Sequence, residues 1–306
     1  MKRVARLLGI IIGVLGVVFV VRELVRNWIV VTDAASGADP IVLVVAFVIG
    51  LASMTTIGLA WHRCLTLLGA WSAVRTAMRD YFVGQLGKYV PGGIWPVVGR
   101  SEMARRSGAS GTVAYGSTAL SLALTYLAAP LTAAGALLTG AGGGEDVRWQ
   151  AIIALVPFAV AVLHPRVAGW ALGALRRLSR REVPLPVPAW GTSIALLAWH
   201  VAAWIGIGTS TWLIAATLDP ESIDLRNLLF ATTLAWLVGF LAIGVPGGIG
   251  VREAVFIAAA SSLSSTGVAA AVAVVARFMF IVVDLTGAAL SALLEGRGSA
   301  GSRASA

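Results

Sequence analysis

Charged residues are scarce in this 306-residue chain, at 12% of the total. Soluble domains carry about 25% charged residues, so the composition excludes an ordinary water-soluble domain. Apolar residues make up 58%, and runs such as residues 41–61 and 192–218 reach the ~20 residues that a helix needs to cross a bilayer. Because lipid cannot pair with backbone polar groups, we expect an all-α polytopic membrane protein.

Cysteine and the signatures of soluble enzymes are also nearly missing. The single cysteine, Cys64, excludes an internal disulfide and a cysteine-cluster metal site. The segment GQLGKY at 84–89 has the wrong spacing for a phosphate-binding loop and no Ser or Thr after its Lys, and neither HExxH nor GxSxG occurs. We therefore expect no enzyme, no ATP-driven engine, no cofactor and no metal.

The basic residues indicate the orientation of the chain. Of 23 Lys and Arg residues, 17 lie at the two ends and in segments 62–111 and 164–189, which we place in the cytoplasm. The loops 32–40, 140–148 and 219–226 are acidic or poor in bases, so we place them outside. We expect both termini in the cytoplasm and a location in a bacterial inner membrane. The net charge of +9 follows this pattern without an aromatic–basic stripe, so we expect no nucleic-acid partner.

The apolar stretches predict the membrane spans. No small-residue cleavage site precedes Arg22, so we interpret the N-terminal stretch as a retained helix rather than a signal peptide. We expect one transmembrane domain over 1–300, a disordered tail at 301–306, and two further apolar segments before Pro91 and Pro246, eight in all. The six full spans are predicted at about 5–25, 41–61, 112–139, 147–163, 192–218 and 268–293.

An internal repeat divides the chain. Residues 81–94 (YFVGQLGKYVPGGI) and 236–249 (WLVGFLAIGVPGGI) are identical at eight of 14 positions at a constant offset of 155. Each copy consists of a span, a segment broken at Pro-Gly-Gly, and a further span, giving repeat 1 at about 41–140 and repeat 2 at about 190–294. The predicted orientation inverts the two copies, an arrangement that is typical of secondary transporters.

The broken segments predict two re-entrant helical hairpins. Arg79, Asp80 and Lys88 precede Pro91 closely and suit a re-entrant helix better than a lipid-facing span. The second broken segment, at 227–245, is long enough to cross the membrane, so both a crossing and a re-entrant hairpin stay open there.

The Pro-Gly-Gly motifs suggest an anion site. Proline lacks a backbone donor and glycine permits left-handed angles, so each break leaves helix-end amides that favour an anion. An arginine and an acid follow each motif, and arginine suits bidentate phosphate contact. The candidate substrate-binding residues are Lys88, Pro91, Gly92, Gly93, Arg100, Glu102, Pro246, Gly247, Gly248, Arg252, Glu253, Arg277 and Asp284.

Other interpretations of these residues stay open. Pro-Gly-Gly also shapes turns, and Arg252 pairing with Glu253 or Glu102 would be purely structural. Arg277 and Asp284 lie seven residues apart, on one face of the last span. They are candidates either for a cavity lining or for an ion pair between helices.

The chain resembles the flippase-like family typified by the transmembrane region of lysylphosphatidylglycerol synthase. The resemblance rests on GQLGKYVPGGIWPVVGRSEMARRSGAS (84–110), GVPGGIGVREAVF (244–256) and VVARF (274–278), and extends over about 5–295. It implies movement of an anionic phospholipid or a polyprenyl-phosphate-linked lipid. We expect no synthase domain, since the sequence stops at Ala306. Segment 117–126 (STALSLALTY) lacks the Arg and Asp that often follow the first motif in this family.

These observations favour a lipid flippase whose partners are membrane lipids with anionic headgroups. Arg252 and Arg100 would hold the phosphate, and Glu253 and Glu102 would orient the two arginines. Two alternatives remain: a non-catalytic subunit that scaffolds a lipid synthase or glycosyltransferase, and a membrane-embedded enzyme that modifies lipids.

Overall fold

The computed structural model describes residues 36–90, 94–139, 161–179, 185–220, 224–241, 250–260 and 262–304, with a few single residues between these ranges. All the regular structure within these ranges is helical. The predicted spans at 5–25 and over most of 147–163 lie outside the described residues.

Four helices are long and apolar enough to cross a membrane, as expected of a helical membrane protein. They are α3 (Pro40–Leu67), α6 (Gly111–Leu138), α9 (Trp190–Leu218) and α12 (Thr266–Ala304), the last over Thr266–Glu295. They confirm four of the predicted apolar stretches as long helices. Helix α12 continues to Ala304, so it enters the tail at 301–306 that we expected to be disordered.

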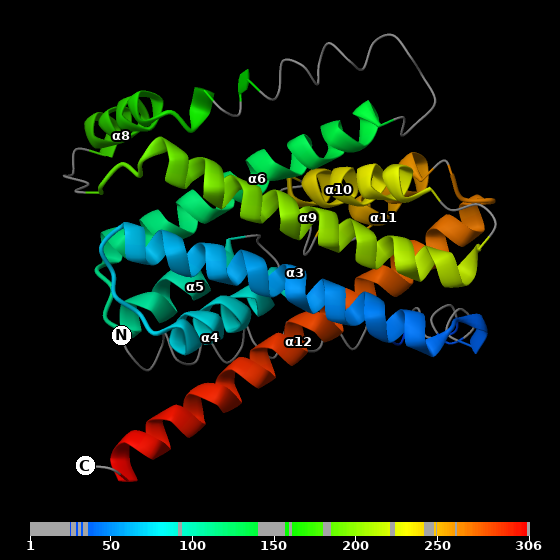
Figure 1. Ribbon diagram of the computed structural model, residues 1–306, viewed down its shortest axis with the longest axis horizontal. Helices are drawn as coiled ribbons and strands as arrows, with labels where there is room; N and C mark the ends of the chain where they lie inside the picture. The colour runs from blue at the N-terminus through cyan, green and yellow to red at the C-terminus, as the bar shows by residue number, and fades with distance from the viewer. Residues whose placement is uncertain are drawn as a thin grey trace.

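The shorter helices form two hairpins. The first hairpin consists of α4 (Val74–Gln85), the 3-10 helix η1 (Leu86–Tyr89) and α5 (Trp95–Arg106), and the second consists of α10 (Leu225–Leu241) and α11 (Val251–Ala259). Figure 1 shows them in different parts of the molecule, with the long helices α3, α9 and α12 running past them. Helix α12 packs against both hairpins, through α4 and through α11. A further helix, α8 (Pro165–Ser179), lies at the edge of the molecule in Figure 1.

Local sequence explains where the long helices begin. Asp39 caps α3, because its Oδ1 accepts a hydrogen bond from the backbone N–H of Ile41 at 2.8 Å, and Pro40 occupies the first turn, where no backbone donor is needed. Ser110 caps α6 in the same way, with its Oγ accepting from the Val113 N–H at 3.3 Å. Such side-chain partners satisfy amides that the helix leaves unpaired.

Helices α3 and α9 pack together through small residues. The Oγ of Ser210 on α9 donates to the carbonyl of Ala46 on α3 at 2.8 Å. A Cβ added at Gly50 would touch this hydroxyl at 3.4 Å, and one added at Gly206 would overlap the Ser53 side chain. Small residues let helix backbones approach closely, which is how helices associate in membranes without a hydrophobic driving force.

Hydroxyl groups inside the long helices bond to their own backbone. Ser53, Thr118 and Thr132 are buried, and each donates to the carbonyl four residues earlier, at 2.7, 3.0 and 2.9 Å. This pattern removes a polar hydrogen from an apolar environment, so these side chains are compatible with apolar helices in lipid.

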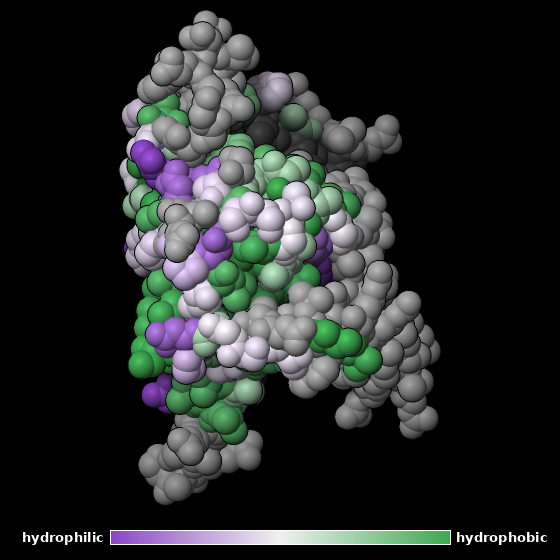
Figure 2. Space-filling view, turned by 90° about the vertical axis from the view of Figure 1, so that its right-hand side faces the viewer, coloured by the Kyte–Doolittle hydropathy of each residue, from purple (hydrophilic) through white to green (hydrophobic). Residues whose placement is uncertain are grey.

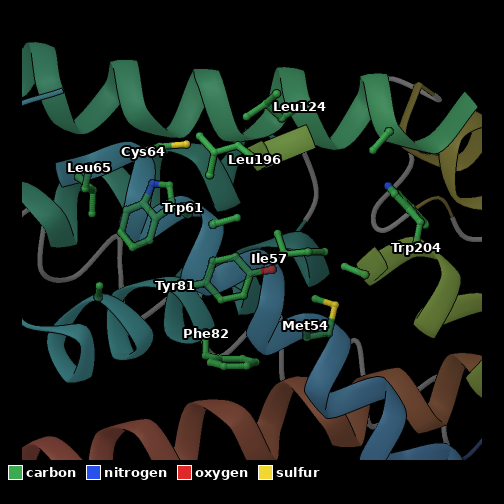
Figure 3. Close-up of a cluster of buried hydrophobic side chains, with 14 of the residues drawn as sticks. Met54, Ile57, Trp61, Cys64, Leu65, Tyr81, Phe82, Leu124, Leu196 and Trp204 are labelled. Atoms are coloured by element: carbon green, nitrogen blue, oxygen red, sulfur yellow. The ribbon is translucent and has the colours of Figure 1, made fainter. Parts of the chain in front are cut away.

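A buried cluster joins the two halves of the chain. Figure 3 shows Trp61 on α3 beside Tyr81 on α4, with Leu196 and Trp204 contributed by α9. Trp61 and Tyr81 have no exposed surface, and their ring centroids lie 6.5 Å apart. The core is therefore shared by residues from both predicted repeats.

The outer surface of the long helices is apolar. Val44 on α3 is 60% exposed and Leu293 on α12 is 64% exposed. Figure 2 looks at the right-hand end of the molecule of Figure 1, where most described residues are green or pale and the purple residues lie in separate spots. Exposed apolar side chains over whole helix faces are costly in water but suit contact with lipid.

Candidate functional site

The second Pro-Gly-Gly break places a glycine in a left-handed backbone conformation. Gly248 is buried with φ +68°, and a Cβ there would lie 2.6 Å from the carbonyl oxygen of Gly239. Only glycine fits such a position, as the motif predicts. The other predicted break residues, Pro91, Gly92, Gly93, Pro246 and Gly247, lie outside the described residues.

In the second hairpin, an arginine from one helix lies on an aromatic ring of the other. The guanidinium carbon of Arg252, on α11, is 3.8 Å from the centroid of Trp236, on α10. A Cβ at Gly239 would overlap the Arg252 side chain, so this glycine makes room for it.

The first hairpin contains the same arrangement. The guanidinium carbon of Arg100, on α5, is 4.4 Å from the centroid of Tyr81, on α4, and a Cβ at Gly84 would lie 2.9 Å from the Cβ of Arg100. At the repeat offset of 155, Tyr81 matches Trp236 and Gly84 matches Gly239. The two arginines differ by three positions in that alignment, which is nearly one helical turn.

Arg252 borders a cavity and has no acidic partner. No hydrogen bond or ion pair joins its guanidinium to another residue in the part of the chain that the structure describes. The cavity has about 20 Å³ of free volume, room for about one water molecule. Thr232, which is 3% exposed, also faces this space, and its Oγ1 has no partner among the described residues. The residues that line this cavity include Thr211, Thr232, Trp236, Arg252, Glu253 and Phe256.

Glu253 ties the second hairpin to α12. One carboxylate oxygen accepts from the backbone N–H of Gly250 at 2.7 Å, which caps α11, and the other pairs with Arg277. Glu253 has no hydrogen bond or ion pair to Arg252 among the described residues, so the expectation that it orients Arg252 stays a prediction. Arg277 binds Glu253 rather than Asp284, so it forms one of the interhelical ion pairs that the sequence allowed.

Lys88 ties the first hairpin to the same face of α12. Its Nζ lies 2.5 Å from Oδ2 of Asp284, and the hydroxyl of Tyr89 donates to that same oxygen at 2.5 Å. Asp284 is completely buried, and its other oxygen, Oδ1, has no hydrogen-bond partner within the described ranges. A buried carboxylate beside a cation is far less costly than an isolated one.

Trp236 brings the two hairpins together. The Nζ of Lys88 lies 5.4 Å from the Trp236 centroid, and Arg252 contacts the same ring. We call Lys88, Trp236, Arg252, Glu253, Arg277 and Asp284 the central group. It contains three cations and two carboxylates, so its net charge is +1.

Arg100 and Glu102 do not belong to the central group. Arg100 is 3% exposed, and its Nη2 donates to Oε1 of Gln85 at 2.8 Å. Glu102 points outward and pairs with Arg105 at 3.1 Å and with Arg106 at 3.6 Å. Glu102 therefore does not contact Arg100, because residues two apart lie on different faces of a helix. That Arg100 shares one phosphate with Arg252 stays a prediction.

Sequence reasoning missed the aromatic residue at the centre. In the sequence, Trp236 is one apolar residue among many. The repeat alignment pairs it with Tyr81, and this pairing of two aromatic residues could have identified it. Thr232 gave no signal, since a threonine in an apolar helix usually bonds to its own backbone. A search of protein families and a search of curated proteins both found no match to this sequence.

Proposed function

We propose that this protein moves an anionic phospholipid, glycolipid or polyprenyl-phosphate-linked lipid between the leaflets of a bacterial inner membrane. The central group would bind the phosphate of the headgroup. The resemblance to the flippase-like family supports the same substrate class.

The observation that carries this proposal is the unpaired guanidinium of Arg252. Lys88 and Arg277 each have a carboxylate partner, whereas Arg252 has a ring beneath it and a cavity beside it. Glu253 lines the same cavity but pairs with Arg277. A partly buried cation without an ion pair of its own is costly unless a ligand neutralises it. Arginine presents its donors in the fork that phosphate oxygens match.

The depth of the central group supports a lipid substrate that crosses the bilayer. Arg277 and Asp284 lie within four residues of the middle of the apolar stretch Thr266–Glu295, which is about 6 Å along the helix. Secondary transporters commonly bind near this depth, where broken helices meet.

The matched hairpins support an inverted repeat. Each hairpin has an aromatic residue, a glycine three positions later and an arginine that lies against both. With the orientation indicated by the basic residues, the first hairpin would enter from the cytoplasm and the second from outside. Both are tied to α12 by an ion pair. Release of one pair would move one hairpin and expose the phosphate site to one side at a time.

The test is lipid movement in proteoliposomes. Wild-type protein and Arg252→Ala are reconstituted at equal density with fluorescent anionic lipids, and leaflet accessibility is followed by dithionite quenching. We expect the variant to be at least tenfold slower, because a hydrogen bond to a charged group contributes about 1.5–3 kcal/mol. Arg105→Ala removes an arginine that pairs only at the surface and is expected to equal the wild type.

The same experiment distinguishes the proposed flippase from the two alternatives. Wild-type protein that does not exceed empty liposomes, with or without a proton gradient, would point to a scaffold subunit of a lipid synthase or glycosyltransferase. A chemically altered lipid, detected by mass spectrometry after incubation, would point to a lipid-modifying enzyme.

A further inference from the structure

Arg100 is a buried cation with no ion-pair partner among the described residues. It lies in α5 and is 3% exposed, between the ring of Tyr81 at 4.4 Å and the ring of Trp61 at 5.4 Å. Tyr81, Tyr126, Cys64 and His200 lie within electrostatic reach of it, and none of them is a carboxylic acid. The charge therefore has no counter-charge of its own, unlike Lys88 and Arg277.

Several hydrogen-bond donors around Arg100 are unsatisfied. Gln85 accepts from Nη2, but Nε of Arg100 has no partner, and neither do the hydroxyl of Tyr81 and Nε1 of Trp61, among the described residues. Trp61 and Tyr81 have no exposed surface. Native proteins satisfy nearly all buried polar groups, so the orphaned Nε of this buried cation indicates a missing acceptor. In Figure 3 the Trp61 nitrogen and the Tyr81 hydroxyl point in different directions, so Nε alone carries this inference.

The missing acceptor carries negative charge and is small. It must accept a hydrogen bond from Nε and neutralise the guanidinium. A water molecule could do the first but not the second, because it carries no charge. Arg100 is enclosed, and the backbone of Gly84 closes one side, since a Cβ there would lie 3.0 Å from Cα of Arg100. An anion attached to lipid chains would need an open edge that this enclosed site does not provide.

We propose that Arg100 holds a small inorganic anion, of which chloride is the model, at a site separate from the central group. The anion accepts a hydrogen bond from Nε and balances the charge between the rings of Tyr81 and Trp61. Its role is to hold the two arms of the first hairpin together, because Arg100 and Gln85 lie on opposite arms. The site does not depend on the lipid-binding role of Arg252.

Two measurements test the site in purified full-length protein. The first is thermal unfolding in sodium chloride against sodium gluconate at equal ionic strength, for wild type, Arg100→Gln and Arg252→Ala. Wild type and Arg252→Ala are expected to unfold at higher temperature in chloride, with a midpoint that rises with the logarithm of chloride concentration. Arg100→Gln is expected to show no difference between the salts.

The second measurement needs no variant. Crystals of the wild type grown in bromide are expected to show one anomalous peak within hydrogen-bond distance of Nε of Arg100. Equal unfolding in both salts, or bromide only at other places, would overturn the proposal and leave Arg100 held by Gln85 and the two rings alone. Displacement of bromide by a short-chain anionic phospholipid, without stabilisation by chloride, would overturn it in favour of a lipid phosphate. Lipid movement lost in Arg252→Ala while the chloride effect remains would separate the two sites.

Discussion

The guanidinium carbon of Arg252 lies 3.8 Å from the ring centroid of Trp236, and the ammonium of Lys88 lies 5.4 Å from the same centroid. One indole therefore contacts a cation from each hairpin. Because the ring takes no proton and no charge, it can keep both cations close while leaving their remaining donors to a ligand.

Replacing Trp236 should weaken lipid movement without removing a charge. Each desolvated cation–π contact contributes up to about 2 kcal/mol, so we expect Trp236→Leu to slow translocation roughly 10-fold and Trp236→Phe less. Trp199→Leu is the matched control, because Trp199 lies on α9 and is 45% exposed. Equal rates in Trp236→Leu and wild type would show that the ring serves packing only.

Breaking the pair between Asp284 and Lys88 should destabilise the fold. Asp284→Asn leaves the Lys88 ammonium without its carboxylate, and losing one partner of a buried ion pair costs about 3–5 kcal/mol. The measurement is the free energy of unfolding in mixed micelles. The double variant with Lys88→Met should recover part of the loss, since it removes the unpaired charge. Glu102→Gln, at the surface, should change stability by less than about 1 kcal/mol.

The two equivalent glycines should differ in their response to a methyl group. At Gly84 the added Cβ meets the backbone of Arg100 at 3.0 Å, whereas at Gly239 it meets only the flexible side chain of Arg252. We expect Gly84→Ala to lower the unfolding temperature, and Gly239→Ala to keep it but lose lipid movement because Arg252 is displaced. Gly135→Ala on α6 has nothing within 4 Å and should be neutral or slightly stabilising. A fully active Gly239→Ala would contradict the role of Arg252.

The orientation predicted from the basic residues determines which end of α6 should be labelled from which side. Arg106→Cys lies before α6 and is expected to react with an impermeant maleimide only after the inner membrane is opened. Thr139→Cys lies just after α6 and is expected to react in intact spheroplasts. The native Cys64 is fully buried and should stay unlabelled, which makes it an internal control. Labelling of both positions in spheroplasts would show that α6 does not cross as expected.

The four long helices were predictable because each is a continuous apolar stretch. The predicted segments 41–61 and 268–293 lie within α3 and α12, which extend beyond them mainly at their C-terminal ends. The left-handed glycine of the second break was predictable for a similar reason, since Pro-Gly-Gly leaves few other backbone solutions.

The partners of the charged residues were not predictable, because they depend on how the helices rotate about their axes. The sequence placed Arg277 and Asp284 on one face, but their partners come from different hairpins, more than 20 residues away in one case and almost 200 in the other. Glu102 and Glu253 each follow a Pro-Gly-Gly motif closely, yet one faces outward and the other is mostly buried. Glu102 pairs with two arginines of its own helix, whereas Glu253 caps α11 and pairs with α12, and neither set of partners is visible in the motif.

The contact between Ser210 and Ala46 joins α3 to α9, the first long helix of each half, so neither half encloses its own small-residue face. If both halves descend from one ancestral segment and lie inverted as the basic residues predict, that segment had to bury this face against an inverted copy of itself. Such an ancestor would have had to insert into the membrane in both orientations.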